Sequence, residues 1–101
     1  MKLEDRGHTL RVVAVKELGA ANAIGFRDWV RESIGEAHQR LEIDLSQTSF
    51  VDSCGLGALV ALHKAVVARA GKLCLLNPQP AVRQLLELTR LNSVFDIRSD
   101  S

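Results

Sequence analysis

The segment FVDSCGLGALV, residues 50–60, places an acid, a hydroxyl and a thiol side by side at Asp52, Ser53 and Cys54. Two glycines one residue apart follow, and the chain then continues as an apolar run typical of a helix. Side chains of these types at a helix start fit four roles: a nucleophile, a redox centre, a phosphate acceptor or a helix cap. The surrounding sequence has to distinguish among them.

A catalytic role for Ser53 or Cys54 requires a general base close by. His8 lies near the first strands, His38 lies at a helix end, and His63 lies about 15 Å from Ser53 along the same helix. The GLG segment also lacks the spacing and the lysine of a phosphate-binding loop, and no resolving cysteine is near Cys54 in sequence. We therefore expect no enzyme, and we interpret His63 as a packing or surface residue.

The simplest role for Asp52 or Ser53 is to cap the helix, because the first N–H groups of a helix lack partners. Capping does not explain Gly55 and Gly57, since each glycine costs about 1 kcal/mol relative to alanine within a helix. Their missing side chains leave the backbone open to close approach by another surface. A phosphate on Ser53 would lie at the positive end of the helix dipole, but beside Asp52 and any docked partner. Both a cap and a phosphorylation switch remain open.

Hydrophobic periodicity predicts the elements that position this segment. We predict strands over residues 10–15, 41–45, 72–76 and 94–97, and a marginal strand before Gly7. We also predict three helices. The first begins after Asn22 as its N-cap, the second spans residues 53–70 and is ended by Gly71, and the third spans residues 80–91. Alternating strands and helices predict an α/β fold in which helices pack on a mixed or mostly parallel sheet. We expect one domain over residues 1–101, with a core at about 8–97.

The spacing of apolar residues also predicts which helix faces are buried. In the first helix these residues are Ala23, Phe26, Val30 and Ile34, and in the last helix they are Val82, Leu85, Leu86 and Leu88.

Composition limits the kind of partner. Thirteen basic and twelve acidic residues among 101 give a formal net charge of +1, which does not favour nucleic acid or an anionic membrane. No apolar run is long enough for membrane insertion, and the N-terminus lacks the features of a signal peptide. Cys54 and Cys74 form neither a disulfide framework nor a zinc-site spacing. We expect a cytoplasmic protein with reduced cysteines, no cofactor, no metal and a protein partner.

The run LEIDLSQTSFVDSCGLGALVALHKAVVARAGKLCLLNPQPAVRQLLELTRLNSVFDI contains an Asp-Ser-[Ser/Thr]-Gly-Leu-Gly-like signature. The matching residues are Asp52, Ser53, Gly55, Leu56 and Gly57. With these features the chain resembles the STAS domains of the anti-sigma-factor antagonist class. The similarity extends more weakly back to about Leu10 and so covers most of the chain.

The resemblance implies a STAS-like fold of about five strands and three to four helices, together with a regulatory binding function. In that class the first hydroxyl of the signature, here Ser53, accepts a phosphate. The unphosphorylated protein binds an anti-sigma factor that is also its serine kinase and so frees the sigma factor, and a phosphatase resets it. We expect a monomer or weak dimer with these partner-binding residues: Asp52, Ser53, Cys54, Gly55, Leu56, Gly57 and Asn22.

Two residues depart from the family pattern. Cys54 stands where a second Ser or Thr is usual, and we interpret it as a small, partly buried residue that replaces a hydroxyl. Gly19 stands where the family commonly has an Asp after the second strand. The alternatives are a non-switching STAS scaffold or accessory subunit of a transport or signalling assembly, in which Ser53 is only a cap, and an enzyme with Ser53 or Cys54 as nucleophile.

Overall fold

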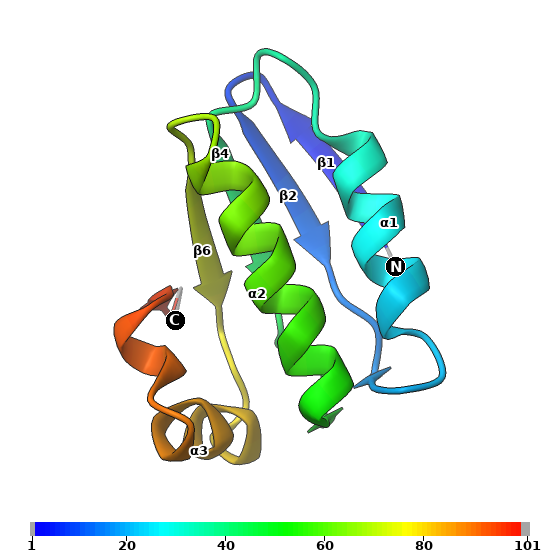
Figure 1. The fold of residues 1–101 in the computed structure, drawn as a ribbon, viewed down its shortest axis with the longest axis vertical. Helices are drawn as coiled ribbons and strands as arrows, with labels where there is room; N and C mark the ends of the chain where they lie inside the picture. Colours follow the sequence, from blue (N-terminus) through cyan, green and yellow to red (C-terminus); the bar gives the residue numbers. More distant parts are fainter. Residues whose placement is uncertain (1, 100–101) are drawn as a thin grey trace.

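The computed structural model describes residues 2–99, and Figure 1 shows the arrangement of its elements. The strands are β1 (Lys2–Arg6), β2 (Thr9–Val13), β3 (Glu17–Leu18), β4 (Arg40–Asp44), β5 (Phe50–Val51), β6 (Lys72–Leu76) and β7 (Asp96–Arg98). The helices are α1 (Ala23–Ser33), α2 (Ser53–Val67), α3 (Pro80–Leu88) and the short 3₁₀ helix η1 (Leu91–Ser93).

Five strands form one mixed sheet in the order β1-β2-β4-β6-β7. β1 pairs antiparallel with β2 through a turn in which Gly7 has a φ of 77°, a left-handed conformation that favours glycine. β2, β4, β6 and β7 are parallel, so each step between them needs a crossover, and α1, α2 and α3 supply these crossovers. The predicted α/β fold, with a mixed sheet of about five strands, is confirmed.

The hydrophobic core lies between the sheet and the helices α1 and α2, which lie side by side across one face of the sheet (Figure 1). Alternate residues of each central strand point toward the helices, as the pleat of a strand requires. The central core residues are Leu10, Val12, Leu41, Ile43, Leu73 and Leu75 from the sheet, and Phe26, Val30, Leu59 and Leu62 from the helices. Burial of these side chains fixes α2 on the sheet and thereby sets the position of its first turn.

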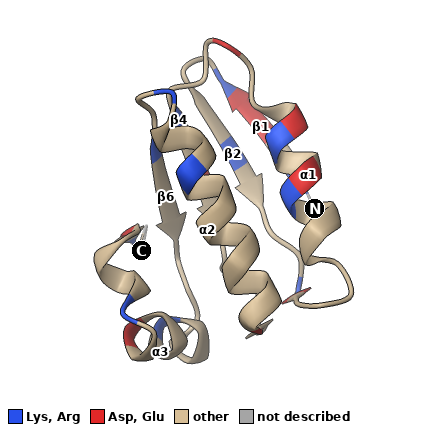
Figure 2. Ribbon diagram, viewed as in Figure 1, with Lys and Arg blue, Asp and Glu red and all other residues tan. Residues whose placement is uncertain are grey.

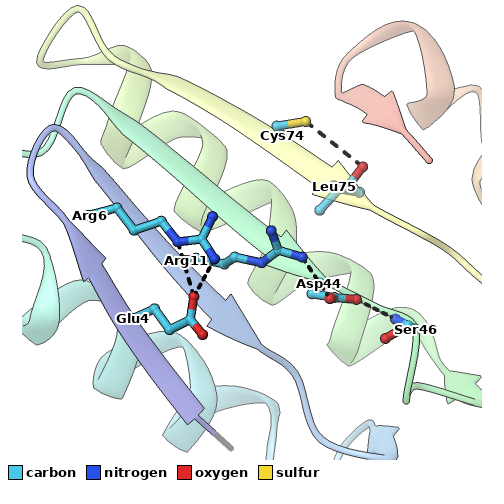
Figure 3. A network of polar contacts seen from close by, with 7 residues as sticks. All are labelled: Glu4, Arg6, Arg11, Asp44, Ser46, Cys74 and Leu75. Atoms are coloured by element: carbon cyan, nitrogen blue, oxygen red, sulfur yellow. Dashed lines mark hydrogen bonds and ion pairs between the residues drawn. The ribbon is translucent and has the colours of Figure 1, made fainter. Parts of the chain in front are cut away.

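The other face of the sheet carries charged side chains that pair with one another. Arg11 lies 3.2 Å from Asp44 across neighbouring strands, and Arg6 lies 2.7 Å from Glu4 on β1 (Figure 3). Cys74 shares this face but is fully buried, and burial raises the pKa of its thiol. Both cysteines are free thiols, as predicted.

The C-terminal end of α2 differs from the prediction. The helix ends at Val67 rather than at residue 70, and Ala70 adopts the left-handed conformation with a φ of 59° that is typical of a glycine after a helix. Gly71 is required for space, because a Cβ there would lie 2.8 Å from the carbonyl oxygen of Gln39 and 2.7 Å from a methyl carbon of Val66.

The predicted last helix is divided into α3 and η1, with Arg90 in the left-handed region between them at a φ of 62°. Leu88 was predicted to be buried, but it is 75% exposed because it lies in the last turn of α3, beyond the core. The predicted strand over 94–97 begins instead at Asp96.

The short parallel pair β3–β5 was not predicted from sequence. Each strand has only two residues, which is too short for an alternating pattern to be visible. This pair packs directly against the start of α2 at Gly55. A Cβ at this residue would overlap the carbonyl oxygen of Leu18 in β3 and would lie 2.9 Å from a methyl carbon of Val51 in β5.

We therefore expect Gly55→Ala to destabilise the fold by about 1–3 kcal/mol, because the new methyl group meets a backbone oxygen that has little room to move. Gly57→Ala is the matched control, since a Cβ there meets nothing within 4 Å. It should stabilise the helix by up to about 1 kcal/mol. Urea unfolding of both variants measures the difference, and equal stabilities would contradict the packing role of Gly55.

Candidate functional site

Asp52 is the N-cap of α2. Its Oδ1 accepts a hydrogen bond of 3.0 Å from the N–H of Gly55, and its backbone carbonyl accepts the first intrahelical bond, 2.9 Å from the N–H of Leu56. The predicted capping role is confirmed for Asp52, and Ser53 becomes the first helical residue.

The same carboxylate also binds the loop between β3 and α1. Its Oδ2 accepts a hydrogen bond of 3.0 Å from the N–H of Ala20, and the N–H of Asp52 donates to the carbonyl of Leu18 at 3.3 Å. The bonds from Gly55 and then Ala20 hold the pKa of Asp52 below its ordinary value. Asp52 thus joins the start of α2 to the loop that precedes α1.

Asn22 lies at the N-cap position of α1, as predicted, but its side chain does not cap that helix. Its Oδ1 accepts from the N–H of Gly19 at 2.9 Å, and its Nδ2 donates to the carbonyl of Glu17 at 2.8 Å. The side chain is therefore turned back to stabilise the loop that Asp52 binds. A competing hydrogen bond within the loop explains why the prediction of a side-chain cap was wrong.

Gly19 provides space for the Asp52 carboxylate. A Cβ at residue 19 would lie 2.7 Å from Oδ2 of Asp52, so any larger residue would force one of the two to shift. An Asp at this position would also bring a second carboxylate against the first. The glycine therefore allows Asp52 to lie against the loop and to accept the N–H of Ala20.

Ser53 is exposed at the first position of α2. Among residues 2–99 its hydroxyl has no hydrogen-bond partner, in contrast to Thr48, which is fully buried and donates to the carbonyl of Val15 at 2.7 Å. Because Asp52 caps the helix, the Ser53 hydroxyl is free to react or to contact another molecule.

The four residues after Ser53 are divided between the surface and the core. Cys54 and Gly57 are exposed, whereas Gly55 and Leu56 are buried. The interpretation of Cys54 as partly buried is wrong, because the side chain lies on the outer face of the first turn. Gly57 leaves an open surface, and Gly55 instead allows the close packing of β3 and β5.

Two open grooves flank this helix start. The first, of about 330 Å³, lies between α1 and α2 and is lined by Ala20, Ala23, Ile24, Arg27, Cys54, Gly57 and Ala58. The second, also of about 330 Å³, lies beside the loop and is lined by Glu17, Gly19, Ala20, Ala21, Asn22, Phe50 and Asp52. Ile24 is 66% exposed and Phe50 is 51% exposed, so each groove has one large apolar side chain at the surface.

Sequence reasoning did not identify Ile24, Arg27 or Phe50 as site residues. An apolar residue on the polar face of the α1 pattern and a Phe beside the signature were the available signals. Their proximity to Cys54 and Asp52, the chain neighbours of Ser53, depends on the packing of α1 against α2 and on the β3–β5 pair.

The histidines are engaged elsewhere. His63 stacks edge-on against Phe95 with a ring-centroid distance of 5.5 Å, which agrees with its interpretation as a packing or surface residue. His38 is buried, accepts from the N–H of Gly35 at 2.8 Å and lies 3.1 Å from Asp5. His8 lies 3.3 Å from the carbonyl of Ala37.

Comparison with known proteins identifies the family. The STAS domain model matches residues 1–101. The chain belongs to the STAS domain family. Within the part of the chain that the structure describes, no helix is long and apolar enough to cross a membrane.

Individual relatives are named as anti-sigma factor antagonists. A Thermotoga maritima protein named as a candidate anti-sigma factor antagonist is 31% identical over 83 residues, 81% of this chain and 74% of that protein. The anti-sigma-B factor antagonist of Bacillus subtilis is 34% identical over 68 residues, 67% of this chain and 62% of that protein. The unphosphorylated form of SpoIIAA, from Bacillus, superposes with a TM-score of 0.84 at 24% identity, over 99% of this chain and 87% of that chain.

The carboxylate of Asp52 should make stability depend on pH. Because its pKa is lowered in the fold, its contribution is fully present above the ordinary value of 3.8 and is lost as the pH falls through the folded value. Asp52→Asn keeps an acceptor for the Gly55 N–H but turns an amide NH₂ toward the N–H of Ala20. We expect its melting temperature to lie below that of the wild type at pH 7, with a difference that narrows below pH 3.8.

Thermal unfolding between about pH 2 and pH 7 measures this effect. Asp28→Asn is the matched control, because Asp28 is a partly exposed carboxylate that binds the neighbouring Arg27 and does not cap a helix. A curve for Asp52→Asn that runs parallel to the wild type over the whole range would exclude this role of the carboxylate.

Proposed function

We propose that this chain is a phospho-regulated protein-binding module, an anti-sigma factor antagonist of the cytoplasm. In its unphosphorylated form it binds an anti-sigma factor that is also a serine kinase. Phosphorylation of Ser53 releases that partner, and a phosphatase restores binding. The chain itself acts by binding and needs no cofactor.

The observation that carries this proposal is the exposed hydroxyl of Ser53, which has no hydrogen-bond partner among residues 2–99. Its two chain neighbours each line one of the grooves, Asp52 the groove beside the loop and Cys54 the groove between the helices. The names of the relatives that cover two thirds or more of the chain support the class of partner. In the modification, the Ser53 oxygen attacks the terminal phosphorus of ATP, ADP leaves, and the hydroxyl proton passes to the kinase or to water. The kinase supplies the catalytic groups, so Ser53 needs no base of its own.

The surface around Ser53 suits a partner that dissociates when Ser53 is phosphorylated. Cys54 and Gly57 leave an uncharged first turn, and α2 carries no charged residue before Lys64 (Figure 2). A docked protein would bury this turn together with Ile24 and Phe50. A phosphate of about −1.5 to −2 charges in that interface would have to be desolvated, which opposes binding.

We expect phosphorylation of Ser53 to weaken partner affinity more than a hundredfold, which corresponds to about 3 kcal/mol. The melting temperature should change little, because the helix start favours an anion by only about 0.3–1 kcal/mol at an exposed site. Ser53→Ala should bind constitutively. Ser53→Asp should reproduce the released state only in part, since one carboxylate carries less charge and fewer acceptor oxygens.

The experiment incubates the protein with its kinase and ATP, maps the phosphate by mass spectrometry, and measures affinity by calorimetry. Ser49→Ala is the matched control, because Ser49 is exposed and lies four residues before Ser53. Phosphate on Ser49 or Thr48, or a Ser53→Ala protein that still loses its partner when ATP is added, would favour the non-switching scaffold.

A second prediction concerns the groove surface at Gly57. We expect Gly57→Arg to keep the fold, since nothing lies within 4 Å of its Cβ position, and to abolish partner binding at micromolar concentrations. Gly25→Arg is the matched control, because Gly25 is also helical and open but lines neither groove. Circular dichroism checks folding and calorimetry checks binding. Wild-type affinity in folded Gly57→Arg would remove this surface from the interface.

A further inference from the structure

The groove between α1 and α2 is lined by Arg27 from α1 and, from α2, by Cys54, the residue that follows Ser53. We propose that the guanidinium of Arg27 forms an ion pair with the phosphate of phosphorylated Ser53, an inference that rests on the proposed phosphorylation of Ser53. The two groups would then occupy the groove between α1 and α2. The partner then loses the groove as a docking surface in addition to meeting a new charge.

The arrangement of the helices supports this pairing. α1 and α2 lie side by side and run in the same direction, so their N-termini share one end of the domain (Figure 1). Ser53 and Gly57 are four residues apart and therefore lie on the same face of α2, and Gly57 and Arg27 line the same groove. Helical side chains lean toward the helix N-terminus, so Arg27 leans toward the end that carries Ser53.

The groove between α1 and α2 has about 330 Å³ of open volume, and Ile24 and Cys54 also line it. Gly57 has no side chain, and a Cβ at that residue would meet nothing within 4 Å. The remaining walls at this end include the small side chains of Ala20 and Ala23. A phosphate attached to the first residue of α2 and a long side chain from the second turn of α1 therefore have room to meet.

The positive charge of Arg27 favours it as the residue that binds the phosphate. Among the residues that line the two grooves, it alone is positively charged. Its Nε and Nη2 atoms bind Oδ1 of Asp28 at 3.0 and 2.9 Å, but both side chains are partly exposed, at 33% and 49%. Such neighbouring surface pairs contribute little, whereas a guanidinium binds a phosphate dianion in a bidentate manner. Exchange of Asp28 for the phosphate is therefore favourable.

The test uses full-length protein with phosphoserine installed at residue 53 during translation, so that it does not depend on any kinase. Phosphorus NMR across pH gives the second pKa of the phosphoserine. In Arg27→Gln this pKa should lie higher than in the wild type by about half a pH unit, because the dianion loses its cation. Arg27→Lys should lie between the two, since a lysine supplies the charge without the bidentate geometry.

Arg31→Gln is the matched control. It removes the same charge from an exposed position one turn farther along α1, outside the groove, and should leave the pKa within a small fraction of the Arg27→Gln effect. Equal titration of wild type and Arg27→Gln, or equal shifts in Arg27→Gln and Arg31→Gln, would overturn the pairing. Either result would leave the phosphorylation of Ser53 itself intact, because mapping the kinase product tests that separately.

Discussion

The candidate site depends on one carboxylate that accepts two backbone N–H groups from different parts of the chain. Asp52 caps α2 through Gly55 and binds the loop before α1 through Ala20. Neither the helix start nor the loop has another side chain that joins them in this way within the described residues. The exposure of Ser53, the loop conformation at Asn22 and the groove between α1 and α2 all follow from this junction.

Two glycines make the junction possible, and each does so by leaving space rather than by adopting an unusual backbone conformation. Gly19 leaves room for the carboxylate of Asp52, and Gly55 leaves room for the carbonyl of Leu18. An Asp at position 19 would have to displace the carboxylate of Asp52 or share its site. With glycine at position 19, the carboxylate next to Ser53 is that of Asp52. This carboxylate already accepts hydrogen bonds from the backbone N–H groups of Gly55 and Ala20.

Sequence patterns predicted the sheet and the three helices, because core burial requires periods of two and 3.6 residues that remain visible in single elements. They also predicted a cap at Asp52 or Ser53, of which the structure selects Asp52. The β3–β5 pair was not predicted, because strands of two residues are too short to show a hydrophobic period. The predictions for the side chains of Asn22 and Cys54 were wrong because both depend on tertiary packing. Packing determines which loop groups Asn22 can hydrogen-bond, and it sets the rotation of α2 about its axis, which places Cys54 at the surface. Gly55 and Gly57 illustrate the same limit. They are identical in sequence terms, but one is needed inside the fold and the other lies at the surface.

Asp52 and Ser53 are neighbours with different roles, and this explains how the proposed phosphorylation of Ser53 can act on binding without disturbing the fold. The carboxylate that stabilises the helix start is turned toward the loop, whereas the adjacent hydroxyl has no structural role in the described residues. Charged residues occur along the sheet strands, α1 and the α3 region, while α2 carries no Lys, Arg, Asp or Glu before Lys64 (Figure 2). A phosphate on Ser53 would therefore add charge to an otherwise uncharged first turn, next to the carboxylate of Asp52 that is already hydrogen-bonded to the backbone. The partner proposed above would bury that turn, whereas the fold leaves it exposed. The same charge that is tolerated in the free domain would therefore oppose the complex.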